Sequence, residues 1–103
     1  MKLVRDRIPE ICRENGQEPV THIAGVREYR RRLRQKLTEE VREFLEADDR
    51  TAPEELADVL EVVYALARNL DVTAAQLEEI RRAKAMERGG FSRGIVWEGN
   101  LER

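Results

Sequence analysis

Hydrophobic residues recur at helical spacing along most of the chain and predict an all-α fold. Between about residues 26 and 47 the apolar positions repeat at intervals of three and four, which places them on one face of a helix; they are Tyr29, Leu33, Leu37, Val41, Phe44 and Leu45. A second predicted helix, ending near residue 70, is apolar around most of its circumference. We therefore expect this second helix to be the central and most buried element.

Helix start and stop signals frame these elements. Thr51–Glu54 and Thr73–Gln76 both have the spacing of a capping box, in which a Thr and a Glu or Gln three residues later satisfy free backbone amides. The helix that follows Thr73 is expected to end before residues 89–90, which are both glycine. Pro9 predicts a short helix over residues 8–14.

Two short segments have a different pattern. Residues 19–24 are partly β-branched and are bounded by Pro19 and Gly25, which is typical of a strand or an extended arm. Residues 91–98 are apolar enough to predict an extended segment that packs on the helices. Neither segment changes the all-α assignment.

Length and composition narrow the choice of function. The 103 residues form a single domain, and a chain this short is expected to associate with further copies, as a homodimer or homotetramer. One cysteine, Cys12, and one histidine, His22, exclude a disulfide within the chain and a Cys/His zinc site built from one chain. The chain lacks a long apolar run, and its net charge is only −2, so we expect a cytoplasmic protein that binds neither membrane nor nucleic acid.

Four acids occupy unusual positions on the two long predicted helices. At about 100° per residue, Glu40 falls within the apolar stripe of the first helix and Glu43 at its edge. Glu55 and Asp58 repeat this arrangement on the second helix. Helices joined by a short loop pack antiparallel, so the two pairs are expected to face each other. Carboxylates that converge in this way are suited to Mg²⁺ or Mn²⁺, which share their coordination shell with substrate phosphates.

Basic residues supply the complementary charge for a phosphate ligand. The candidates near the beginning of the chain are Lys2, Arg5 and Arg7. Lys84 and Arg88 form a second cluster, although cations at that position also complement a helix dipole. An alternative interpretation of the acids is that Arg30, Arg34 or Lys36 neutralises them in ordinary surface ion pairs.

The motifs resemble those of a known superfamily. Residues 37–43 followed by 55–58 are similar to the ExxE…ExxD signature of the all-α nucleoside triphosphate pyrophosphohydrolases, which include MazG, dimeric dUTPase and phosphoribosyl-ATP pyrophosphohydrolase. Residues 2–9 and 84–91 resemble a small, single-domain MazG-like branch. This resemblance implies a MazG-like helical bundle completed by oligomerisation, and Mg²⁺-dependent cleavage between the α- and β-phosphates that releases a nucleoside monophosphate and pyrophosphate.

The resemblance also implies roles for individual residues. Glu40, Glu43, Glu55 and Asp58 would be the metal ligands and catalytic acids, with Glu39 a lesser candidate ligand. A housecleaning nucleotide pyrophosphohydrolase is the favoured function, and the phosphoribosyl-ATP enzyme of histidine biosynthesis is the alternative within the same chemistry. A non-enzymatic helical oligomer that binds nucleotides or nucleic acid remains a further alternative, based on the arginine-rich residues 29–36.

Overall fold

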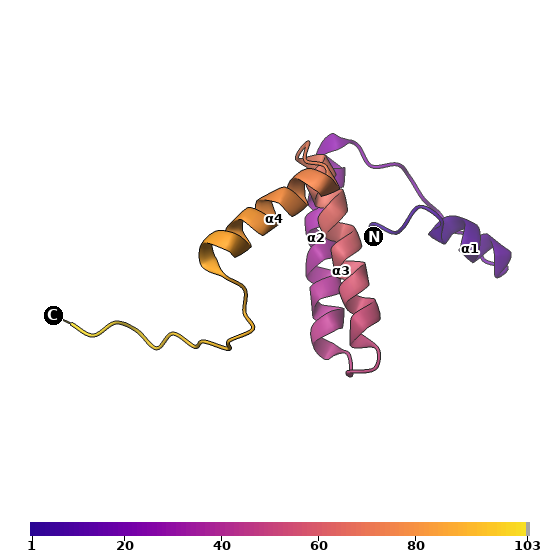
Figure 1. Cartoon of the computed structure of the whole chain (residues 1–103). Coiled ribbons are helices and arrows are strands. Elements are labelled where there is room, and N and C mark those ends of the chain that lie inside the picture. Colours follow the sequence, from indigo (N-terminus) through magenta and orange to yellow (C-terminus); the bar gives the residue numbers. More distant parts are fainter. Residues whose placement is uncertain (103) are drawn as a thin grey trace.

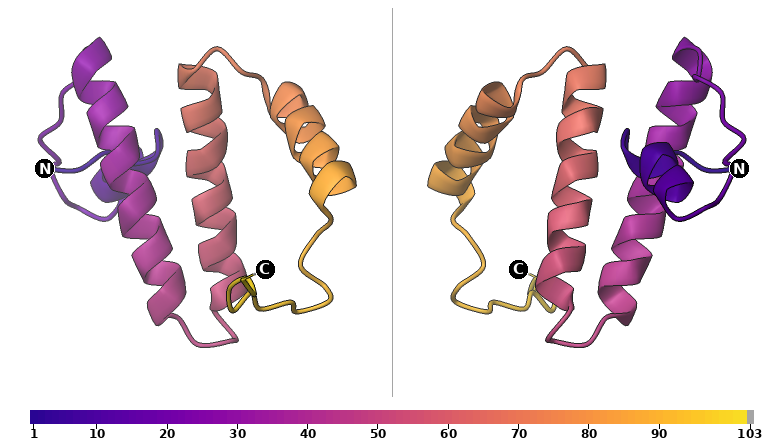
Figure 2. Two further views of the ribbon diagram at one scale, coloured as in Figure 1. Left: turned by 90° about the vertical axis from the view of Figure 1, so that its left-hand side faces the viewer. Right: turned by 90° about the vertical axis from the view of Figure 1, so that its right-hand side faces the viewer.

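The computed structural model describes residues 1–102, and within that range the chain contains four helices and no strand. The helices are α1 (Ile8–Glu14), α2 (Val26–Glu46), α3 (Ala52–Asn69) and α4 (Ala74–Arg88). α2 and α3 form an antiparallel pair, whereas α4 leads away from the pair at an angle and contacts α3 over a small area (Figures 1 and 2). The predicted all-α class and all four predicted helices are confirmed. No helix of residues 1–102 has both the length and the apolarity to cross a membrane.

The apolar stripes of α2 and α3 face each other and form the core. Leu33 on α2 is 2% exposed, and Val62 and Ala67 on α3 are also buried. Burial of such side chains is the main force that holds the pair together. α3 contacts both α2 and α4, which confirms its predicted central place. The prediction that it is also the most buried element is wrong, because Leu56 and Leu60 are about half exposed and α3 has no more buried residues than α2.

The two predicted capping boxes have different outcomes. At the start of α4, Thr73 accepts a hydrogen bond from the backbone amide of Gln76 at 3.1 Å, and the Gln76 side chain accepts one from the amide of Thr73 at 2.9 Å. The box predicted at residues 51–54 is wrong, because Thr51 makes no side-chain cap. Asp48 instead accepts hydrogen bonds from the amides of Arg50 and Thr51, each at 3.0 Å, which orders the loop between α2 and α3.

The two short segments have different outcomes. Residues 19–24 form no strand but the extended arm given as the alternative, with Val20 and Ile23 fully exposed. The final segment does extend away from α4, but it does not pack on the helices (Figure 1). Phe91 is 99% exposed and Trp97 is 77% exposed. These apolar side chains are therefore not part of a hydrophobic core within a single chain.

The single chain is elongated. Its radius of gyration is 18.4 Å and its extents are 66 × 34 × 26 Å, whereas a compact domain of this length has a radius of gyration of about 13 Å. α1 makes no packing contact with another described helix. Much of the apolar surface consequently remains in contact with solvent, including Leu45 and Leu60 on the α2–α3 pair.

The capping geometry yields a stability prediction. Thr73→Ala removes the hydrogen bond to the Gln76 amide and should lower the free energy of unfolding by about 1 kcal/mol. Thr51→Ala is the matched control, because it removes only long hydrogen bonds from the Thr51 hydroxyl to Asp48, at 3.2 and 3.4 Å, and no helix cap, so it should have a smaller effect. Urea unfolding monitored by circular dichroism measures both. Equal losses in the two variants would contradict the assignment of the caps.

Candidate functional site

The structure brings together all four predicted acids and Glu39. Carboxylate oxygens of Glu40, Glu55 and Asp58 lie within 4.8 Å of one another across the α2–α3 pair. Carboxylate oxygens of Glu39, Glu40 and Glu43 also lie within 4.8 Å of one another and form a second group, on α2 alone. Glu40 belongs to both groups. The two groups together are called the acidic site below.

Burial makes the acidic site energetically unusual. Glu40 is only 7% exposed, and it is the one buried charged residue among residues 1–102. One carboxylate oxygen of Glu40 and one of Glu55 are shielded from solvent and have no hydrogen-bond partner. An unpaired buried polar oxygen is costly, and a positively charged ligand between the helices would remove that cost. The two oxygens are therefore an observation in favour of a cation at this position.

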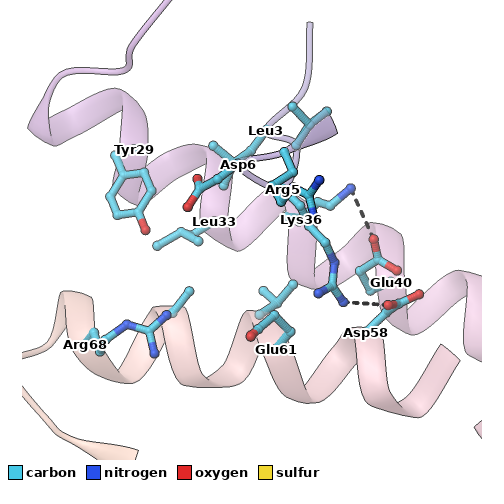
Figure 3. Close-up of a pocket in the computed structure, with 14 residues that line it drawn as sticks. Leu3, Arg5, Asp6, Tyr29, Leu33, Lys36, Glu40, Asp58, Glu61 and Arg68 are labelled. Atoms are coloured by element: carbon cyan, nitrogen blue, oxygen red, sulfur yellow. Dashed lines mark hydrogen bonds and ion pairs between the residues drawn. The ribbon is translucent and has the colours of Figure 1, made fainter. Parts of the chain in front are cut away.

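Three protein cations approach the acidic site. Lys36 Nζ lies 3.1 Å from Glu40 Oε1 and 3.4 Å from Glu39 Oε2. Lys2 Nζ is 3.3 Å from Glu39 Oε1, and an Arg5 guanidinium nitrogen is 2.7 Å from Asp58 Oδ1 (Figure 3). Arg30, Arg34 and Lys36 were the alternative ion-pair partners expected from the sequence. Lys36 does pair with the acids, whereas Arg30 and Arg34 form no ion pair within residues 1–102.

The charges shift the ionisation of their neighbours. The pKa of Glu43 is raised, first through the hydrogen bond that its protonated form shares with Glu40 and then through repulsion by that carboxylate. Burial acts to lower the pKa of Lys36, but its hydrogen bond to Glu40 and the nearby negative charges outweigh burial and raise it. Burial similarly opposes ionisation of Glu39, yet Lys2 and Lys36 lower its pKa overall. Lys36 and Glu39 therefore remain a charged pair at neutral pH.

The carboxylates of the acidic site outnumber its protein cations. Five carboxylates face three protein cations, so the acidic site carries excess negative charge when its acids are ionised. The donors are all carboxylate oxygens, which hard cations such as Mg²⁺ and Mn²⁺ prefer. The residues thus fit a divalent cation in charge and in chemistry.

A cavity of about 430 Å³ adjoins the acidic site. It lies between residues 3–7, here called the N-terminal arm, and the facing sides of α2 and α3, with Glu40 and Asp58 in its wall (Figure 3). Tyr29 and Glu61 also line the cavity, and neither was singled out as a site residue from the sequence. The signal for Glu61 was present, because it continues the three-residue spacing of Glu55 and Asp58 along α3.

The predicted phosphate-binding cations separate into two groups. In the first group, Lys2 and Arg5 form ion pairs with acids of the acidic site. Arg7 lines the cavity and forms an ion pair with Glu10. Lys84 and Arg88 lie towards the end of α4, which contacts α3, and they neither line the cavity nor pair with the described acids. One chain therefore brings the first cluster, but not the second, to the acidic site.

Comparisons with known proteins agree with this arrangement. Residues 6–84 match the family described as phosphoribosyl-ATP pyrophosphohydrolase. The chain belongs to this family. All five residues of the acidic site lie inside the match, whereas Lys2 and Arg5 precede it. Membership in the phosphoribosyl-ATP pyrophosphohydrolase family supports a nucleotide pyrophosphohydrolase type of function.

One curated relative is also similar. A protein of Mycolicibacterium smegmatis, described as uncharacterized, is 49% identical over 51 residues, which make up 50% of this chain and 52% of the relative. The chain thus spans about half the length of the curated relative that it matches. No solved structure matches the chain.

Substitution of Glu55 tests whether the acidic site holds a cation. Glu55→Gln keeps the shape of the side chain and removes a charge that has no ion-pair partner within residues 1–102. The apo protein should be no less stable, while the stabilisation by Mg²⁺, about 2.7 kcal/mol at 100 times the Kd, should fall by more than half. Thermal unfolding with and without Mg²⁺ measures the effect.

The matched control is Glu54→Gln, one residue earlier on α3 and outside both acid groups. It should retain the full stabilisation by Mg²⁺. A native protein whose thermal unfolding does not respond to Mg²⁺ or Mn²⁺, or a Glu55→Gln variant that responds as the native protein does, would contradict a cation site here.

Proposed function

We propose that this chain is a Mg²⁺-dependent nucleoside triphosphate pyrophosphohydrolase with a housecleaning role. It would cleave between the α- and β-phosphates to give a nucleoside monophosphate and pyrophosphate. The observation that carries the proposal is the acidic site, in which the buried oxygens of Glu40 and Glu55 have no partner. Family membership supports the same class of chemistry.

Glu40, Glu43, Glu55 and Asp58 would hold the cation. When bound, Mg²⁺ neutralises phosphate oxygens and lowers the pKa of a nearby water. Glu43 is the exposed member of the set and is the candidate to accept the proton of the attacking water. No nucleophilic side chain is required, because hydrolysis of a phosphoric anhydride depends on positioning and charge neutralisation.

The N-terminal cations would bind the polyphosphate. Arg5 and Lys2 lie against the acidic site, so their side chains can contact a phosphate group that shares the cation with the carboxylates. Arg presents a planar fork of donors that matches phosphate oxygens. Arg7 lies at the same cavity and is the third candidate.

The second candidate function is phosphoribosyl-ATP pyrophosphohydrolase of histidine biosynthesis. The description of the matched family favours it, and the same four acids would perform the reaction. The two functions differ only in the nucleotide that is accepted. A panel of ordinary, deoxy- and modified nucleoside triphosphates together with phosphoribosyl-ATP distinguishes them.

Substitution of the acids tests the reaction itself. Glu40→Gln and Asp58→Asn should each lower kcat/KM by at least about 100-fold, because each removes a charged ligand from the cation. Glu78→Gln on α4 is the control, since Glu78 pairs with Arg81 away from the acidic site. Release of pyrophosphate from the panel, measured with Mg²⁺ and with Mn²⁺, is the assay.

Two results would contradict the proposal. In the first, every nucleotide of the panel stays intact with both metals, which would favour a non-enzymatic nucleotide-binding protein. In the second, hydrolysis occurs but Glu40→Gln and Asp58→Asn retain the native rate. The second result would place the reaction elsewhere on the chain.

We also propose that the protein functions as a homo-oligomer, a dimer or a tetramer. The support is the apolar surface of the elongated chain: Leu45 is 73% exposed, and Leu56 and Leu60 are about half exposed. Contiguous apolar surface of this kind marks association sites on other proteins. Light scattering should give a mass at least twice the 12.0 kDa of one chain. A folded monomer of 12.0 kDa at micromolar concentration would contradict this expectation.

A further inference from the structure

The cavity beneath the N-terminal arm extends away from the acidic site along both long helices. Glu40 and Asp58 line one end, whereas Tyr29 and Arg68 lie at the other (Figure 3). Tyr29 precedes Glu40 by eleven residues on α2, which corresponds to about 16 Å along the helix axis. The cavity therefore continues well beyond the space that a single cation and its carboxylates require.

The walls of the cavity combine apolar surface with a few polar groups. Leu33 and Val62 are buried and form its floor, and Leu3 and Val4 of the N-terminal arm contribute apolar surface opposite them. Small-molecule sites typically have this composition and volumes of about 300–1,000 Å³. A flat, largely apolar group such as a nucleobase would exclude water from these walls.

Two carboxylates inside the cavity set its preference for hydrogen-bond donors. Asp6 of the N-terminal arm and Glu61 of α3 both line it, and within residues 1–102 neither forms an ion pair or a side-chain hydrogen bond. Carboxylates accept hydrogen bonds and repel phosphates. Hydroxyl groups of a ribose and amino groups of a base are suitable donors, whereas the polyphosphate belongs at the metal-binding end beside Arg5; Arg68 lies at the opposite end of the cavity.

The alternative place for a nucleoside is less suitable. A second cavity of about 220 Å³ lies beside α3 and is lined by Arg5, Ala57, Leu60, Glu61 and Tyr64. It contains no member of the acidic site.

We propose that the cavity beneath the N-terminal arm binds the nucleoside part of the nucleotide. The base lies against Leu33 and Val62, and the donors of the nucleoside face Asp6 and Glu61. This assignment rests on the proposed function, because it takes the phosphates to lie at the acidic site. The first seven residues would then bind both parts of the nucleotide. Asp6, Leu3 and Val4 would contact the nucleoside, and the basic side chains would contact the phosphates.

Filling the cavity tests the proposal. Ala65 lines it from α3, so Ala65→Phe should occupy part of the space intended for the base. Isothermal titration with Mg²⁺ compares two probes, an α,β-methylene nucleoside triphosphate that resists cleavage and inorganic pyrophosphate. Ala65→Phe should weaken binding of the nucleotide by at least about tenfold and leave binding of pyrophosphate within about twofold.

Three further variants make the result decisive. Ala75→Phe introduces the same side chain at an exposed position of α4 and should bind both probes like the native protein. Glu61→Ala removes one acceptor at an exposed position, where folding is not at risk, and should weaken only the nucleotide, by at least about threefold. Because Glu61 also lines the second cavity, Asp6→Ala, which removes an exposed acceptor that lines only the cavity beneath the N-terminal arm, decides the question if Ala65→Phe does not fold.

The outcomes separate this inference from the proposed function. If the native protein hydrolyses nucleotides but Ala65→Phe and Glu61→Ala bind the nucleotide as tightly as the native protein, the cavity assignment is overturned and the hydrolase survives. If the nucleotide binds with the expected sensitivity to both variants yet is never hydrolysed in its natural form, the cavity assignment stands and the hydrolase fails.

Discussion

The structure depends on the electrostatic compensation of carboxylates placed between two packed helices. Glu40 is held at 7% exposure beside the core, and its second oxygen, like that of Glu55, has no protein partner. An arrangement of this kind is unfavourable unless a cation compensates it. Lys2, Arg5 and Lys36 compensate part of the negative charge. The same helical contact that forms the core therefore places unpaired carboxylate oxygens where a divalent cation could bind.

The beginning of the chain contributes both to the acidic site and to the wall of the cavity. Lys2 and Arg5 reach the acids, while the intervening apolar residues close the cavity over the facing sides of α2 and α3 (Figure 3). Under the proposed function, this arrangement matches a nucleotide, which has a charged polyphosphate at one end and a flatter, less polar nucleoside at the other.

The sequence allowed the helices and the acids to be predicted because both depend on local spacing. Apolar periodicity located α2 and α3, and it placed Glu40 on their shared face. The cap of α3 was predicted wrongly because the Thr51 hydroxyl donates to Asp48 instead of accepting from the Glu54 amide, which donates to the backbone carbonyl of Thr51. The exposed final segment was mistaken for a packed one, since apolar composition alone does not reveal whether a partner surface exists. The ion pair between Arg5 and Asp58 joins residues 53 positions apart, and no local pattern predicts such a contact.

The most direct test of the central claim is to locate the cation itself. Crystals grown with Mn²⁺ and measured at the manganese absorption edge reveal the ion by its anomalous scattering. The account predicts a peak between α2 and α3, within coordination distance of carboxylate oxygens of Glu40, Glu55 and Asp58. A map without a peak there, in which all three carboxylates are paired with protein cations, would contradict it.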